Sequence, residues 1–72
     1  MAEIKFFGYL AEIAGTRRKE VRLEDPLPLR ELLPSRFPEE NIIILIDEKP
    51  GRLDSLITNG NTVAIMPILS GG

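Results

Sequence analysis

The segment TVAIMPI (residues 62–68) reads as the last β-strand of the chain, and LSGG (residues 69–72) follows it directly. β-Branched and apolar residues dominate the segment, as is typical of a strand that packs on a core. Glycine has no side chain, so Gly71 and Gly72 can thread a narrow channel and present a bare carboxylate to another protein's active site. We therefore expect a sheet whose last strand leads into a protruding, reactive tail.

The strand expected beside this segment lies at the other end of the chain. Residues 4–9 (IKFFGY) are rich in β-formers and predict a first strand. Residues 10–14 predict one helical turn, which Gly15 ends in a left-handed conformation. Residues 20–24 (EVRLE) alternate between apolar and charged side chains, which predicts a hairpin partner for the first strand with one wet face.

The main helix is expected over residues 28–37, where Leu29, Leu32 and Leu33 recur at helical spacing. Pro34 removes a backbone hydrogen bond and clashes with the preceding turn. The helix should therefore stop or kink near Leu33, with a bent second turn after it.

Two further strands and a tight turn are expected in the second half. Residues 42–46 (IIILI) are apolar without alternation, which indicates a strand covered on both faces or with one face against a partner. Residues 52–57 predict a short strand or a single turn. Residues 59–61 (NGN) give a strong turn signal before the last strand.

This order of elements predicts an α+β fold of the β-grasp (ubiquitin-like) type. A mixed sheet would carry one main helix packed across one face. The last strand would lie beside the first in the middle of the sheet. We expect one domain over residues 1–72, with residues 69–72 as a flexible tail.

The composition excludes several functional classes. The 72-residue chain has no cysteine and no histidine, so it lacks a thiol nucleophile, the usual general base and the commonest metal ligand. Its net charge is −2, and the only basic run, Arg17-Arg18-Lys19, reads as a solvated turn, with a docking patch as the alternative. We therefore expect no catalytic centre, no metal site and no nucleic-acid surface.

The sequence shows no pattern of a membrane-spanning or secreted segment. The longest strongly apolar run, residues 42–46, is too short to cross a membrane, and the first residues form no signal-peptide pattern. A cytoplasmic location is the expectation.

Four acidic residues fall at expected turns, so we do not interpret them as an acid–base pair: Glu12, Asp47, Glu48 and Asp54.

The chain resembles the ubiquitin-like sulfur carriers, most closely the small subunit of molybdopterin synthase. The matching positions extend over the whole chain and are Phe6, Phe7, Leu10, Glu12, Gly15, Leu32, Leu33, residues 44–46, residues 59–61, Val63, Ala64, Pro67 and residues 70–72. Three departures stand out. The family usually has Asp where this chain has Asn61, Asn where it has Asp47, and an ordinary helix former where it has Pro34.

The resemblance implies chemistry at the carboxyl terminus. A separate E1-like activating enzyme would join the Gly72 carboxylate to AMP, using ATP and magnesium. The acyl-adenylate would then accept sulfur from a persulfide donor and become a thiocarboxylate. In molybdopterin synthase this sulfur builds the dithiolene of molybdopterin, and the large subunit is the catalyst. Gly71 and Gly72 would be the reacting arm of a non-catalytic carrier that itself binds no cofactor.

A partner surface is expected beside the tail. If Phe6 faces the core, strand alternation places Phe7 on the open side of the sheet, together with Met66 and Ile68. With Leu69 and Ser70 they would form the contact with the large subunit or the activating enzyme. Ordinary core packing is the alternative, because a slip of one residue exchanges the faces.

Three other functions stay open. The same tail chemistry serves sulfur carriers for thiamine thiazole synthesis and tRNA thiolation. A ubiquitin-like modifier would instead join Gly72 to a lysine of a target protein. A plain binding module would have an inert tail, so that loss of Gly71 and Gly72 would change nothing.

Overall fold

The computed structural model describes residues 1–68, and the predicted tail, residues 69–72, lies outside the described part. In chain order its elements are β1 (Ala2–Phe6), α1 (Leu10–Ala14), β2 (Arg18–Val21), β3 (Leu27–Pro28), the 3-10 helix η1 (Leu29–Leu32), β4 (Ile42–Ile46), β5 (Lys49–Pro50), β6 (Leu56–Ile57) and β7 (Thr62–Pro67).

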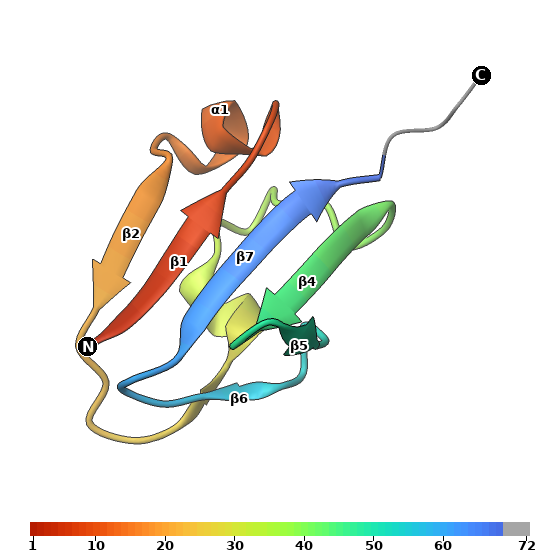
Figure 1. The fold of residues 1–72 in the computed structure, drawn as a ribbon. Coiled ribbons are helices and arrows are strands. Elements are labelled where there is room, and N and C mark those ends of the chain that lie inside the picture. Colours follow the sequence, from red (N-terminus) through yellow and green to blue (C-terminus); the bar gives the residue numbers. More distant parts are fainter. Residues whose placement is uncertain (69–72) are drawn as a thin grey trace.

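One mixed sheet forms the body of the molecule, with the strand order β2-β1-β7-β4-β5 (Figure 1). β7 runs parallel to β1 and antiparallel to β4, so the last strand lies beside the first at the centre. β3 and β6 make a separate two-stranded sheet. The predicted α+β β-grasp fold with a mixed sheet is confirmed.

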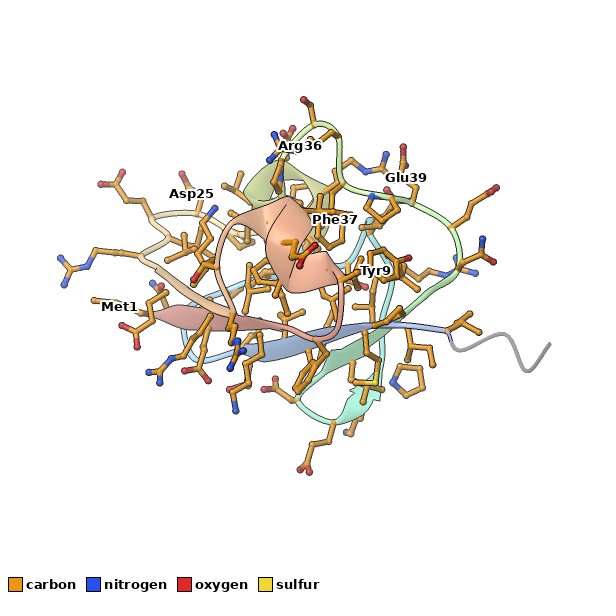
Figure 2. The ribbon with its side chains drawn as sticks, turned by 90° about the horizontal axis from the view of Figure 1, so that it is seen from above. Met1, Tyr9, Asp25, Arg36, Phe37 and Glu39 are labelled. Atoms are coloured by element: carbon orange, nitrogen blue, oxygen red, sulfur yellow. The ribbon has the colours of Figure 1, made fainter. Side chains whose placement is uncertain are left out.

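One face of the sheet carries the core. Figure 2 shows α1 and the loops between β2 and β4 on one side of the sheet, and no described element covers the other side. The buried apolar side chains are Ala2, Ile4, Phe6, Leu10, Leu23, Leu29, Leu32, Phe37, Ile44, Ile57, Val63 and Ile65. Their alternate positions in β1 and β7 show that the strands keep the period of two predicted for them. The result is a two-layer fold with one open sheet face.

The segment expected to be the main helix is shorter than residues 28–37. Only Leu29–Leu32 is helical, as a 3-10 turn, and Leu33 is extended at φ −114° and ψ 155°. The backbone N–H groups of Leu29 and Arg30 donate to carbonyl oxygens of the loop before β6, at 2.9 and 3.0 Å. The predicted stop at Leu33 is confirmed, because the residue before Pro34 is driven out of the helical region.

The strand predicted over residues 20–24 is displaced toward the N-terminus, since β2 covers Arg18–Val21. The side chain of Asn59 accounts for its end. The Asn59 Nδ2 donates to the Leu23 carbonyl oxygen at 2.6 Å, and the Leu23 N–H donates to the Asn59 Oδ1 at 2.9 Å. The Asn59 amide thus takes the place of a neighbouring strand for Leu23.

Other boundaries follow the expected elements closely. β4 and α1 have the predicted bounds, and Gly15 has the expected left-handed conformation at φ 80°. The first strand was predicted over residues 4–9, but β1 covers Ala2–Phe6, because the chain turns at Gly8 (φ 58°) before α1 begins. In residues 52–57 only Leu56–Ile57 forms a strand.

Two of the three positions that depart from the family pattern, Asp47 and Asn61, contact each other. Asp47 and Glu48 form the two-residue turn between β4 and β5, with φ of 51° and 68°. One carboxylate oxygen of Asp47 accepts the Thr62 N–H at 2.9 Å, and the other accepts the Asn61 Nδ2 at 2.6 Å. The two side chains thus place one carboxylate against one amide in this chain.

This contact predicts a compensating pair of substitutions. Asn61→Asp would set two carboxylates against each other, with an expected loss of about 1–2 kcal/mol of stability. The double variant Asp47→Asn with Asn61→Asp should recover most of that loss, measured by urea denaturation at neutral pH. Two losses that simply add in the double variant would show that the side chains act independently.

Candidate partner-binding site

Four apolar side chains gather on the open face of the sheet, and we call them the apolar patch: Phe7, Ile43, Met66 and Ile68. Phe7 is 46% exposed, Ile43 42% and Ile68 49%, while Met66 is half-buried. Large apolar side chains exposed as a group on a small protein mark a surface for another protein. The apolar patch is therefore the first candidate site.

Strand register brings the apolar patch together from three segments. Ile43 lies directly opposite Met66 in the β4–β7 ladder. The Phe7 N–H donates to the Ile65 carbonyl oxygen at 3.0 Å, which extends the β1–β7 pairing by one residue. The Ile68 N–H continues the other ladder by donating to the loop before β4, also at 3.0 Å. Backbone hydrogen bonds thus fix the position of each member.

Gly8 allows the chain to turn away directly after Phe7. Its φ is 58°, in the left-handed region that favours glycine. A Cβ at this position would lie 3.1 Å from the Pro67 Cγ, closer than ordinary packing. The close approach of Gly8 to the end of β7 holds Phe7 beside the last strand.

The structure brings together three of the residues that the sequence predicted for partner binding: Phe7, Met66 and Ile68. The other predicted site residues, Leu69, Ser70, Gly71 and Gly72, lie outside the described residues. Ile43 was missed, although the apolar run without alternation in residues 42–46 left one face of that strand open to a partner.

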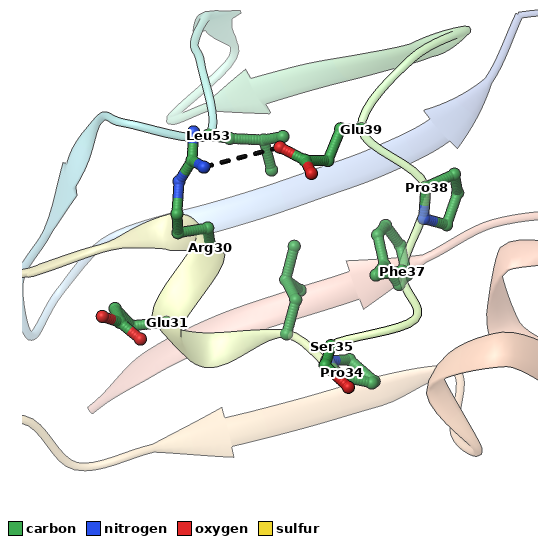
Figure 3. Close-up of a pocket in the computed structure, with 9 residues that line it drawn as sticks. Arg30, Glu31, Pro34, Ser35, Phe37, Pro38, Glu39 and Leu53 are labelled. Atoms are coloured by element: carbon green, nitrogen blue, oxygen red, sulfur yellow. Dashed lines mark hydrogen bonds and ion pairs between the residues drawn. The ribbon is translucent and has the colours of Figure 1, made fainter.

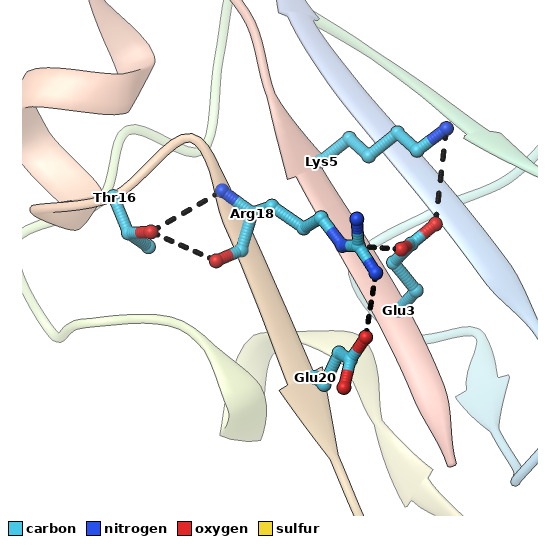
Figure 4. A network of polar contacts seen from close by, with 5 residues as sticks. All are labelled: Glu3, Lys5, Thr16, Arg18 and Glu20. Atoms are coloured by element: carbon cyan, nitrogen blue, oxygen red, sulfur yellow. Dashed lines mark hydrogen bonds and ion pairs between the residues drawn. The ribbon is translucent and has the colours of Figure 1, made fainter.

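A network of charged side chains joins β1 and β2 (Figure 4), and its member Lys5 lies two residues before Phe7, on the same face of the sheet. The Arg18 guanidinium contacts Glu20 at 2.6 Å and Glu3 at 2.5 Å, and Lys5 lies 3.7 Å from Glu3. The hydrogen bond to Glu20, followed by the charges of Glu3 and Glu20, raises the pKa of Arg18 above its ordinary value. Thr16 Oγ1 donates to the Arg18 carbonyl oxygen at 2.8 Å and fixes the start of β2.

A shallow depression of about 460 Å³ adjoins both features, at the end of the sheet where β1 ends and β2 begins. Its lining residues are Lys5, Phe6, Phe7, Gly8, Ala11, Arg17 and Arg18. Phe7 is shared by this depression and the apolar patch. The apolar patch therefore adjoins a concave surface that is lined in part by basic side chains.

A second depression, of about 190 Å³, lies on the covered side of the sheet (Figure 3). Phe37 and Leu53 contribute its apolar wall, and the Arg30 guanidinium lies 3.4 Å from the Glu39 carboxylate at its rim. Arg30 also contacts Asp54 at 2.7 Å. These ion pairs connect η1 to the loop before β4 and to the loop before β6, so we interpret them as structural.

Residues 1–68 contain neither a cluster of metal ligands nor a helix that could span a membrane. No group of three or more Asp and Glu side chains in this part of the chain could hold a metal ion. Within the same residues, neither helix has the length and hydrophobicity that a bilayer crossing requires.

Comparison with known proteins gives one family match and several similar folds. The model of the ThiS family matches residues 4–72. No curated protein sequence matches the chain significantly.

Solved structures with the same fold include proteins from three archaea. SAMP1 from Haloferax volcanii is 22% identical with a TM-score of 0.71, over 99% of this chain and 98% of that one. A putative molybdopterin converting factor, subunit 1, from Pyrococcus furiosus is 18% identical with a TM-score of 0.71, over 94% and 97%. Urm1 from Sulfolobus solfataricus is 24% identical with a TM-score of 0.63, over 92% and 99%. At these identities the likeness shows a shared fold.

Proposed function

Because the chain belongs to the ThiS family and is a ubiquitin-fold sulfur carrier, we propose that it carries sulfur on Gly72 as the small subunit of molybdopterin synthase. The family match across residues 4–72, which includes the diglycine end, is the observation that carries this proposal. The likeness in fold to a putative molybdopterin converting factor subunit supports the choice of pathway. In this role the chain is a carrier, and the large subunit performs the catalysis.

The proposed reaction takes place at one carboxylate. An activating enzyme joins the Gly72 carboxylate to the α-phosphate of ATP and releases pyrophosphate. The terminal sulfur of a persulfide attacks the acyl carbon, and AMP leaves. A thiol then attacks the donor's sulfur in the resulting acyl disulfide, forms a disulfide with the donor and releases the thiocarboxylate, which the large subunit uses to build the dithiolene. The chain contributes the carboxylate and the surface by which partner proteins hold it.

Intact-mass spectrometry tests the proposal directly. The chain would be incubated with ATP, magnesium, an activating enzyme and a persulfide donor, and then treated with a thiol alkylator. The sequence has no cysteine, so selective alkylation of the chain requires a new thiocarboxylate. Absence of alkylation with several competent activating enzymes would contradict the proposed function.

A protein modifier is the second candidate, because one structure of similar fold is the small archaeal modifier protein 1 of Haloferax volcanii. In that role Gly72 would form an isopeptide bond with a target lysine. Conjugates that carry a Gly-Gly remnant on lysine would support this role. Sulfur transfer to the large subunit, to a thiazole synthase or to a tRNA-thiolating enzyme would distinguish the carrier pathways.

Phe7→Ala tests the proposed partner surface. Phe7 is 46% exposed, so Phe7→Ala should cost less than about 1 kcal/mol of stability. The partner should bury the ring at the interface, so the same change should weaken binding about 30-fold or more. Titration calorimetry with the large subunit or activating enzyme measures the loss. Leu56→Ala, at a side chain 62% exposed on β6, is the matched control. A large loss of stability would mean that Phe7 is a core residue.

A further inference from the structure

We propose that the basic depression beside Phe7 receives an acidic segment of the partner protein that binds the apolar patch. The inference rests on the proposed function, since it names the chemistry of the partner at that same surface. It assigns a role to Arg17, from the basic run that the sequence alone presented as a solvated turn, whereas Lys19 of that run donates to the Leu32 carbonyl oxygen at 3.0 Å.

Local charge is the first argument. The protein as a whole is acidic, with a net charge of −2 and a sequence pI near 5.0. Three of its nine Lys and Arg residues nevertheless line one concave surface: Lys5, Arg17 and Arg18. A depression with one sign of charge concentrates ligands of the opposite sign and steers their approach. The local charge therefore favours an anionic occupant.

The second argument is which of these cations are available. Arg18 is occupied by Glu3 and Glu20, while the Lys5 ammonium keeps only a loose contact with Glu3 at 3.7 Å. Among residues 1–68 no hydrogen bond or ion pair involves the Arg17 guanidinium. A guanidinium presents a planar fork that matches a carboxylate through two hydrogen bonds. Arg17 is thus the main contact that we assign, with Lys5 beside it.

Position is the third argument. The depression lies at the end of the sheet where β1 and β7 both end, because these strands run parallel (Figure 1). Phe7 lines it and also belongs to the apolar patch. A protein that buries Phe7 as part of the apolar patch therefore contacts the rim of the depression. An interface with an apolar centre and a charged rim is the usual arrangement between proteins.

The charge distribution favours a protein over a nucleic acid as the occupant. Phosphate binding needs several cations along a groove, because each contact neutralises one backbone charge. Here the neighbouring Glu3 and Glu20 would repel a polyanionic backbone, whereas a short acidic segment can avoid them. Carboxylates on a folded partner meet this geometry better.

Charge reversal at Arg17 is the decisive variant, and Arg22→Glu is its matched control. Both residues are exposed arginines and both changes alter the net charge equally. They flank β2 at opposite ends, about 16 Å apart along the strand, so only Arg17 lines the depression. We expect Arg17→Glu to raise the KM of the activating enzyme or large subunit for this chain about tenfold at low salt. The difference should shrink as salt rises from about 0.05 to 0.5 M.

A second measurement does not need the sulfur pathway. The isotope-labelled chain would be titrated with a synthetic peptide of alternating glutamate and phenylalanine, and amide shifts followed by NMR. Shifts centred on Lys5, Phe7 and Arg17, absent in Arg17→Glu and kept in Arg22→Glu, would support the inference. They would do so even where no thiocarboxylate forms and the proposed function fails.

Two results would overturn the inference. In the first, thiocarboxylate forms on the wild-type chain while Arg17→Glu and Arg22→Glu give the same KM at every salt concentration. In the second, a single-stranded oligonucleotide shifts the same amides at lower concentration than the acidic peptide, which would assign the depression to phosphate.

Discussion

Removal of Gly72 is expected to abolish thiocarboxylate formation, with a loss of at least a hundredfold in the alkylated product. The proposed chemistry has one reacting group, the carboxylate of that residue. The shortened chain would end in the Gly71 carboxylate, which would lie one residue short of the reacting position in the activating enzyme's channel. A displacement of about 1 Å can cost a hundredfold in rate. Intact-mass spectrometry after alkylation measures the product.

Stability supplies the control for this variant. Removal of Gly72 leaves in place every core residue of the described part, residues 1–68, so the shortened chain should keep its urea midpoint. Gly71→Ala tests the steric part separately, because it keeps the terminal carboxylate and adds one methyl group. Full sulfur transfer by Gly71→Ala would contradict the narrow channel, and alkylation of the chain without Gly72 would contradict Gly72 as the carrier residue.

Asn59→Ala is expected to be the most destabilising single change at a polar residue, at about 2–3 kcal/mol. The amide of Asn59 both donates to and accepts from the backbone of Leu23, at 2.6 and 2.9 Å. The Leu23 side chain is buried in the core, and alanine would leave its backbone donor and acceptor without a protein partner. Domains of 72 residues are stable by only about 4–11 kcal/mol. The expected loss is therefore a large share of the total free energy of unfolding.

Urea denaturation measures this effect, and Asn59→Asp separates its two parts. Aspartate keeps the acceptor for the Leu23 N–H but loses the donor and sets a carboxylate against the Leu23 carbonyl oxygen. We expect it to be at least as destabilising as alanine at neutral pH. An unchanged midpoint for both variants would show that water replaces the Asn59 amide without loss.

Much of the fold could be predicted from short segments of the sequence. The strand at residues 42–46, the helical turn at residues 10–14 and the left-handed Gly15 lie where the sequence predicted them. Each depends on neighbours along the chain: apolar pattern, local propensity and the freedom of glycine. The central position of the last strand was also predicted, because a hairpin, a helix and further strands in this order leave few alternatives.

Errors arose where a partner from elsewhere in the chain decided the outcome. The strand predicted over residues 20–24 ends at Val21, since Asn59 binds Leu23 from 36 residues away. The expected main helix is a four-residue 3-10 turn, because the loop before β6 accepts its first two N–H groups and Pro34 follows. Propensity within a segment contains no information about such partners.

The sequence by itself determined the β-grasp fold, the period of two in β1 and β7 and the diglycine end on which the proposed function depends. The tertiary structure alone decided which side chains share a surface. Phe7, Ile43 and Met66 form one patch, and Arg17 lies beside it, because strand pairing joins residues that are far apart in sequence. The contact between Asp47 and Asn61 likewise appears only after folding. Local sequence fixes the conformation of a segment, whereas long-range pairing and burial determine its neighbours.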